Sequence, residues 1–321
     1  MRLAAVMKTR PVLRLLSGAL IALFCAREAC SAAEPPLSVD IGGRKIIIPV
    51  FEGFARADGV NANWDKLSAP LVADTNRMVA TLLQKDDVAR LAQGLLARPR
   101  RVFQIQTYRN AETVEISDET FSQARNQIRA GIEESRATIE AEIKKRFASK
   151  SNALSGLAGV DVALSITNST MLGYFGESPT SLGFTTAMKV GAKTSTISLG
   201  KKVVVAMMVT TVNGRIFYLA ATSDYYSEAD REWVEKAVVS WRDAVRGANP
   251  KVEKKTAAEI AATAPMPGTE GNGCRVEVKV GEPIISVSVS DKTLKKTTLW
   301  VILGSVVVGV IWISQRKIGI Q

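Results

Sequence analysis

The spacing of hydrophobic residues changes from a helical period to a period of two near residue 160. Between residues 118 and 149 apolar side chains recur every third or fourth position, which predicts one long helix with Ser117 as its N-cap. Beyond residue 160 apolar and polar positions alternate, as they do in half-buried strands. The strands predicted in this part of the chain are 160–166, 184–190, 202–212 and 215–221.

Turn and capping motifs add further elements. Gly42-Gly43 lies between two alternating segments and predicts a hairpin over residues 37–50. Asn213-Gly214 predicts a tight hairpin between two of the strands above. Ser227-Glu-Ala-Asp230 has the spacing of a capping box and predicts a helix that ends at Gly247.

Between the predicted hairpin and residue 118, the sequence predicts two helices and one strand. Apolar residues after Ser68 favour a helix over residues 68–84, and a shorter helix begins at Asp86 and ends near Gly94. Residues 101–108 are predicted to form a strand. Together these elements predict an α+β domain in which an antiparallel sheet packs against helices, an α-β-α sandwich.

Residues 1–33 have the features of a secretory signal peptide. Lys8, Arg10 and Arg14 are basic, residues 15–24 carry no charge, and small residues follow at 31–33. The apolar run is about half the length that a membrane-spanning helix needs, so we favour a signal peptide over a first transmembrane helix.

Residues 297–315 form a second segment without charge, close to the C-terminus. At about 1.5 Å per residue this segment is about 28 Å long, enough to cross a hydrocarbon core of about 30 Å. Trp300 and Trp312 lie near its two ends, where indole rings favour the headgroup layer. The residues predicted to form the membrane anchor are Leu299, Trp300, Ser305, Gly309 and Trp312.

The two terminal segments predict a single-pass protein of the bacterial inner membrane with its main domain in the periplasm. Lysines on the outer flank of the span weaken the positive-inside signal, so the orientation is taken from the signal peptide. The sequence leaves open whether the segment before the span rejoins the main sheet. The predicted organisation is a signal peptide (1–33), an exported α+β domain (34–247), a linker (248–273), a short β segment or stalk (274–296), a transmembrane helix (297–315) and a cytosolic tail (316–321).

The composition excludes several classes of active site. The 321 residues include no histidine, which excludes Ser-His-Asp and Cys-His nucleophiles, histidine general bases and histidine-ligated metals. The net charge is +11, which in other proteins can favour nucleic-acid binding. Because this chain is predicted to be exported, no nucleic-acid partner is expected. No catalytic, cofactor-binding or metal-ligating residue is assigned, and no cofactor is expected.

Two patterns remain for catalysis without histidine. Ser198-Leu-Gly-Lys201 has a Ser-x-x-Lys spacing, but it precedes a predicted strand, whereas enzymes with this motif place the serine at the start of a helix. The close carboxylate groups are Asp86/Asp87, Glu112/Glu115 and Asp224/Glu228/Asp230. Helix capping explains the first and the last of these groups. Tyr225-Tyr226 could line a pocket, although packing at a strand end is the favoured interpretation.

Two stretches of the chain resemble a known fold group. One is Pro49-x-x-x-Gly53-Phe54 after an apolar strand, and the other is residues 203–241, where two strands flank Asn213-Gly214-Arg215 and a helix carries Ser240-Trp241. They resemble the α-β-α sandwich shared by PsbP, Mog1 and the DcrB group of bacterial envelope proteins. The resemblance implies this fold and an accessory or binding role, and it implies no catalytic residues.

The leading hypothesis is a non-catalytic, membrane-tethered domain that binds a partner or supports an envelope assembly. Its expected partners are membrane lipid, through residues 297–315, and an unidentified envelope protein. The alternatives are a histidine-free envelope hydrolase that uses Ser198 and Lys201 or carboxylates, and a ligand-sensing subunit of a membrane complex. Ser305 and Gly309 have the spacing of a helix-pairing motif, so a homodimer linked through Cys274 is the alternative to the favoured free thiol.

Overall fold

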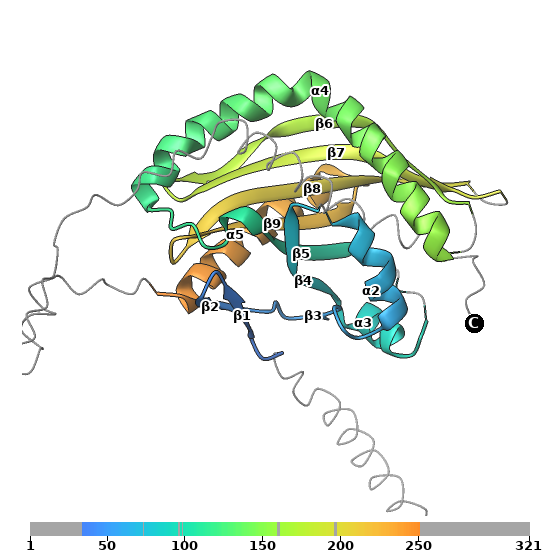
Figure 1. Ribbon diagram of the computed structural model, residues 1–321, viewed down its shortest axis with the longest axis horizontal. Helices are drawn as coiled ribbons and strands as arrows, with labels where there is room; N and C mark the ends of the chain where they lie inside the picture. Colours follow the sequence, from blue (N-terminus) through green and yellow to red (C-terminus); the bar gives the residue numbers. More distant parts are fainter. Residues whose placement is uncertain are drawn as a thin grey trace, which may run out of the picture.

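The computed structural model describes residues 34–250, except residues 73, 96, 98, 159–160 and 196–197 (Figure 1). The predicted signal peptide, membrane anchor and Cys274 lie outside the described residues. Among the residues that are described, no helix is long and apolar enough to span a membrane. The strands are β1 (Leu37–Ile41), β2 (Arg44–Ile48), β3 (Phe54–Arg56), β4 (Asn76–Gln84), β5 (Arg101–Tyr108), β6 (Ala163–Ser178), β7 (Ser181–Lys193), β8 (Ser198–Val212) and β9 (Arg215–Asp224). The helices are α2 (Ala62–Ser68), α3 (Lys85–Ala92), α4 (Asp118–Ala158) and α5 (Glu228–Ala248), with short 3₁₀ turns η2 (Ala69–Leu71) and η3 (Arg109–Ala111).

Seven strands form one sheet in the order β3-β4-β5-β9-β8-β7-β6. All neighbours in this sheet are antiparallel, and β1 and β2 form a separate hairpin. The order places β5 directly beside β9, although more than a hundred residues separate them in the chain. This pairing brings the start of β5 to the place where β9 ends and the chain continues into α5 (Figure 1).

The sheet has a buried layer on each face. Helix α4 arches over β6 and β7 on one face, while α5 and the β1–β2 hairpin cover the other (Figure 1). Side chains alternate between the two layers along each strand; on β9, for example, Tyr218 lies in the α4-side core and Leu219 in the α5-side core. The predicted α+β fold, with an antiparallel sheet packed against helices, is confirmed.

Aromatic rings fill the α5-side core. Trp241 of α5 is fully buried and packs edge-on against Phe103 of β5, with ring centroids 5.1 Å apart. Its indole Nε1 donates a hydrogen bond of 3.0 Å to the carbonyl oxygen of Pro49. Trp241 therefore joins the helix, the sheet and the segment that follows the β1–β2 hairpin.

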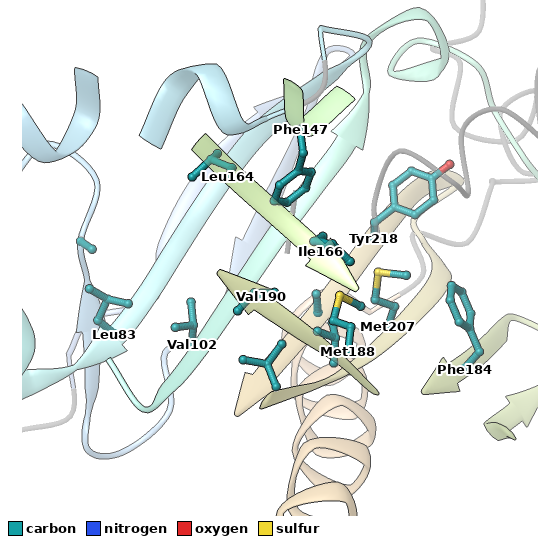
Figure 2. Packing of buried hydrophobic residues seen from close by; sticks show 14 of the residues in the cluster. Leu83, Val102, Phe147, Leu164, Ile166, Phe184, Met188, Val190, Met207 and Tyr218 are labelled. Carbon is teal, nitrogen blue, oxygen red and sulfur yellow. The ribbon is translucent and has the colours of Figure 1, made fainter. Parts of the chain in front are cut away.

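The C-terminal half of α4 is attached to the edge strand β6. Figure 2 shows Phe147 between Leu164 and Ile166 in the α4-side core. One turn further along, the hydroxyl oxygen of Ser151 accepts a hydrogen bond of 2.8 Å from the backbone N–H of Leu164. Ser155 accepts a second one, also 2.8 Å, from the N–H of Val162. These bonds occupy N–H groups that an open sheet edge would otherwise expose.

The β1–β2 hairpin is held against the sheet by backbone geometry and by one arginine. Gly42 has a positive φ of 57°, and a Cβ at this position would clash with the backbone carbonyl of Glu112. The buried guanidinium of Arg215 donates to the carbonyl oxygens of Ile41, Thr113 and Gly42 at 3.3, 3.1 and 2.8 Å. Burial, followed by the nearby charge of Arg44, lowers the pKa of Arg215.

The predicted helix over residues 68–84 is wrong. Residues 76–84 form β4, and helix α2 with the 3₁₀ turn η2 lies directly before this strand. The reason is burial on both faces: Leu82 lies in the α5-side core and Leu83 in the α4-side core. A strand covered on both sides has a continuous apolar run, which over a few residues cannot be distinguished from the buried side of a helix.

Candidate functional site

Basic and aromatic side chains gather where β9 continues into α5. Backbone hydrogen bonds fix this corner: Asp224 N–H donates to Arg100 O at 3.1 Å, and Tyr225 N–H donates to Lys202 O at 2.9 Å. Two cationic doublets, Arg100-Arg101 at the start of β5 and Lys201-Lys202 in β8, thereby reach the same end of the sheet. We call this region the basic–aromatic end, and it consists of Arg100, Arg101, Lys201, Lys202, Tyr225, Tyr226 and Trp233.

Tyr226 is the most exposed aromatic or aliphatic side chain of this region. Its side chain is 76% exposed, although Arg100 lies over the ring at 5.4 Å from the centroid. The phenol donates a hydrogen bond of 3.3 Å to Asp224, whose other carboxylate oxygen accepts 2.6 Å from Lys201. Two contacts therefore orient an aromatic ring that faces solvent.

Asp230 connects the same ring to the first turn of α5. Its carboxylate accepts hydrogen bonds from the backbone N–H groups of Tyr226 and Ser227 at 3.0 and 3.1 Å, and from Arg100 at 3.2 Å. The predicted capping box is present. Burial acts to raise the pKa of Asp230, but the two backbone bonds and Arg100 hold this pKa below its ordinary value.

On the face of the sheet that α5 covers, two cations of this region lie over aromatic rings. The guanidinium of Arg101 lies over the ring of Trp233, 4.1 Å from its centroid, and the ammonium of Lys202 lies 5.0 Å from the ring centroid of Tyr225. Desolvation, followed by the charge of Arg100, lowers the pKa of Arg101. The phenol of Tyr225 donates 3.2 Å to Glu228, and its pKa is raised by desolvation and by this carboxylate.

The structure places Ser198 and Lys201 on one strand, three positions apart. Their backbone partners on β7 are Lys193 and Val190, in an unbroken register. Side chains an odd number of positions apart on a strand point to opposite faces, and three steps span about 10 Å. The two side chains therefore do not form the hydrogen-bonded pair that a Ser-Lys nucleophile requires.

The predicted carboxylate groups are involved in local structure. Glu112 accepts from Arg77 Nε at 2.7 Å and also binds Thr107; these bonds hold its pKa below the ordinary value although burial acts to raise it. Glu115 pairs with Arg44 at 3.0 Å. Among the described residues, no group of three or more acidic or cysteine side chains could hold a metal ion.

Sequence reasoning identified only part of this region. It singled out Tyr225, Tyr226 and Asp224, but it considered Lys201 only as part of the Ser-x-x-Lys spacing and did not recognise the two basic doublets. Each doublet adjoins a predicted strand, which was the available signal. What the sequence did not provide was the pairing of β5 with β9, because this contact joins distant parts of the chain.

Comparison with known proteins gives little further information. No family model and no curated protein matches the chain. Among solved structures, a mutant of protein Mog1 is 13% identical, with 67% of this chain and 93% of that chain covered and a TM-score of 0.26. The Saccharomyces cerevisiae Ran-binding protein Mog1p is also 13% identical, with 67% and 92% covered and a TM-score of 0.25. Mog1 is one of the proteins that the sequence resembles, and a likeness at these TM-scores carries no argument about function.

Proposed function

We propose that the protein is a membrane-tethered domain on the periplasmic side of a bacterial inner membrane, where it binds an envelope protein through its basic–aromatic end. The tether is inferred from the two apolar terminal segments of the sequence, residues 15–24 and 297–315. The resemblance to the PsbP, Mog1 and DcrB group implies an accessory role of the same kind.

One observation carries the binding role, namely the oriented but exposed ring of Tyr226. Tyrosine and arginine dominate the energetics of protein interfaces because they bury a large area with few rotatable bonds. At this site Arg100 and Asp224 already restrict the ring, so that the Tyr226 side chain would lose little entropy when a partner binds it. Single exposed apolar residues are ordinary on protein surfaces, but a ring held on two sides by charged groups is a preorganised contact.

Site-specific photocrosslinking in cells tests this role. A photoreactive phenylalanine derivative replaces Tyr226, and a matched derivative replaces Lys45, an exposed residue near the turn of the β1–β2 hairpin, away from the basic–aromatic end. We expect one discrete protein adduct from position 226, no such adduct from position 45, and loss of the adduct in an Arg100→Glu background. Equal adducts at both positions, or none at position 226 at equal expression, would contradict the proposal.

A further inference from the structure

Two cations at the basic–aromatic end have no carboxylate partner among the described residues. Arg100 and Lys201 each pair with an aspartate, at 3.2 and 2.6 Å. Arg231 of α5 pairs with two glutamates, at 2.8 and 2.9 Å. Arg101 and Lys202 lie instead over the aromatic rings of Trp233 and Tyr225, and no ion pair within 4 Å joins either of them to a described carboxylate. Their positive charge is therefore available to a ligand.

Two buried polar atoms lie at the same place without a hydrogen-bond partner. One is Nε of Arg101 and the other is the hydroxyl oxygen of Ser223, a residue with no exposed surface. Arg101 and Ser223 are direct cross-strand partners on β5 and β9, so their Cβ atoms lie about 5 Å apart on the same face. Buried polar atoms usually have a hydrogen-bond partner, so a group with hydrogen-bond acceptors at this place would satisfy both of them.

Lys202 lies on the other side of Ser223. Ser223 pairs with Val204 of β8, and Lys202 is two positions from Val204, hence on the same face of the sheet. The face of the sheet that α5 covers thus presents Arg101, Ser223 and Lys202 across three adjacent strands. The rings of Trp233 and Tyr225 flank them, and Trp233 is itself packed 5.6 Å from Phe103.

We propose that Arg101, Ser223 and Lys202 form a subsite that binds an aspartate or glutamate side chain from an acidic segment of the partner. This proposal rests on the proposed partner-binding function and adds the chemistry of the partner. A carboxylate has two oxygens, and it can accept from the planar guanidinium and from the serine hydroxyl while it neutralises the lysine. The two aromatic rings provide apolar walls for the methylene groups of the acidic side chain. Glu228, the acidic group next to Tyr225, is already paired with Arg231.

Isothermal titration calorimetry on the full-length chain in a non-ionic detergent tests the subsite. The probe is hexaglutamate, with hexaglutamine as the uncharged control, at low ionic strength. We expect hexaglutamate to bind and hexaglutamine not to bind. Arg101→Gln and Lys202→Gln should each weaken binding about tenfold, and Ser223→Ala about fivefold, which are the usual effects of charged and neutral hydrogen bonds. Lys45→Gln, which removes one distant positive charge, should change the affinity less than about twofold.

Several results would overturn the subsite. They are equal losses in Arg101→Gln and Lys45→Gln, equal binding of the two peptides, and no binding of hexaglutamate. Tighter binding of inorganic phosphate than of hexaglutamate would overturn the carboxylate assignment. Binding to phosphatidylserine vesicles that requires Arg101, without binding of hexaglutamate, would assign the surface to lipid and overturn it too. Lys202 is exposed, so its variant is expected to fold even if Arg101→Gln does not.

A spectroscopic readout separates ligand binding from a structural role. In nuclear magnetic resonance spectra the Nε–H proton of Arg101 should shift when hexaglutamate is added, and it should not shift with hexaglutamine. Binding of hexaglutamate without a discrete adduct at position 226 would support the subsite and contradict the proposed partner surface. An adduct at position 226 without any shift at Arg101 would support the proposed partner surface and contradict the subsite.

Discussion

Replacement of Trp241 by alanine should destabilise the domain more than any change on the exposed side of α5. The indole has no exposed surface, and it packs against Phe103 at 5.1 Å and Phe51 at 6.0 Å. Loss of a buried aromatic side chain costs about 3–5 kcal/mol of the free energy of unfolding. We expect Trp241→Ala to lie near the upper end of this range, because the carbonyl of Pro49 also loses its donor.

Trp241→Phe separates the two contributions. Phenylalanine keeps a ring in the α5-side core but cannot donate to Pro49, so its cost should be about 1–3 kcal/mol, that of a lost buried hydrogen bond with some loss of packing. Lys236, on the same helix, has a side chain that is 79% exposed, and Lys236→Ala should stay within about 0.5 kcal/mol.

The assay is urea denaturation of the full-length chain, followed by far-ultraviolet circular dichroism. The slope of free energy against urea should be the same in all variants, so that shifts of the midpoint report stability. If Trp241→Ala costs less than about 0.5 kcal/mol, the level of surface substitutions, the assigned packing of α5 on the sheet is refuted. If the phenylalanine variant costs as much as the alanine variant, the loss belongs to the hydrogen bond and not to the ring.

Four further predictions concern topology, charge and the free thiol. A reporter that is active only after export should work when fused at Gly247 and fail when fused after Gln321, and equal activity would contradict the single-span topology. Because the folded-state pKa of Asp230 is depressed, its stabilising contribution is present above the ordinary carboxyl pKa of about 4 and is lost as the pH falls through the lower folded-state pKa. The stability difference between wild type and Asp230→Asn should therefore shrink as the pH is lowered from about 5, and a constant difference would refute this. Arg215→Ala leaves three backbone carbonyls without their donor and should lower the free energy of unfolding by about 3 kcal/mol in the urea assay. A loss under about 0.5 kcal/mol would show that these hydrogen bonds do not hold the β1–β2 hairpin against the sheet. Non-reducing electrophoresis of thiol-blocked membranes should show a monomer that is unchanged in Cys274→Ser, and a dimer band lost in that variant would favour the disulfide.

The elements with strong local signals could be predicted from the sequence. Asn213 and Gly214 both have positive φ, 48° and 72°, which is why this dipeptide marked its hairpin so clearly. The capping box of Ser227 and Asp230 likewise located the start of α5. In both cases the information lies within four residues of the chain, so no knowledge of the rest of the fold is needed.

Irregular strands were harder to predict because they break the pattern that identifies a strand. β6 was expected to end at residue 166, but it continues to Ser178. Its pairing with β7 shifts register between Thr167 and Thr170, and Asn168 has a positive φ of 54°. A bulge of this kind moves later side chains to the other face and ends the strict alternation. A similar shift between Met78 and Ala80 obscures β4.

The basic–aromatic end could not be predicted in full because its chemistry depends on strand order. Within each doublet, successive residues of an extended chain point to opposite sides. Lys201 pairs with Asp224 and Arg100 with Asp230 of α5, while Arg101 and Lys202 lie on the face of the sheet that α5 covers and meet aromatic rings. This division into paired and unpaired cations follows only once β5 is placed beside β9, and β9 beside β8. The same strand order brings the hydroxyl of Ser223 between the two unpaired cations, and for this reason we assign the subsite to these three residues and not to the basic doublets as a whole.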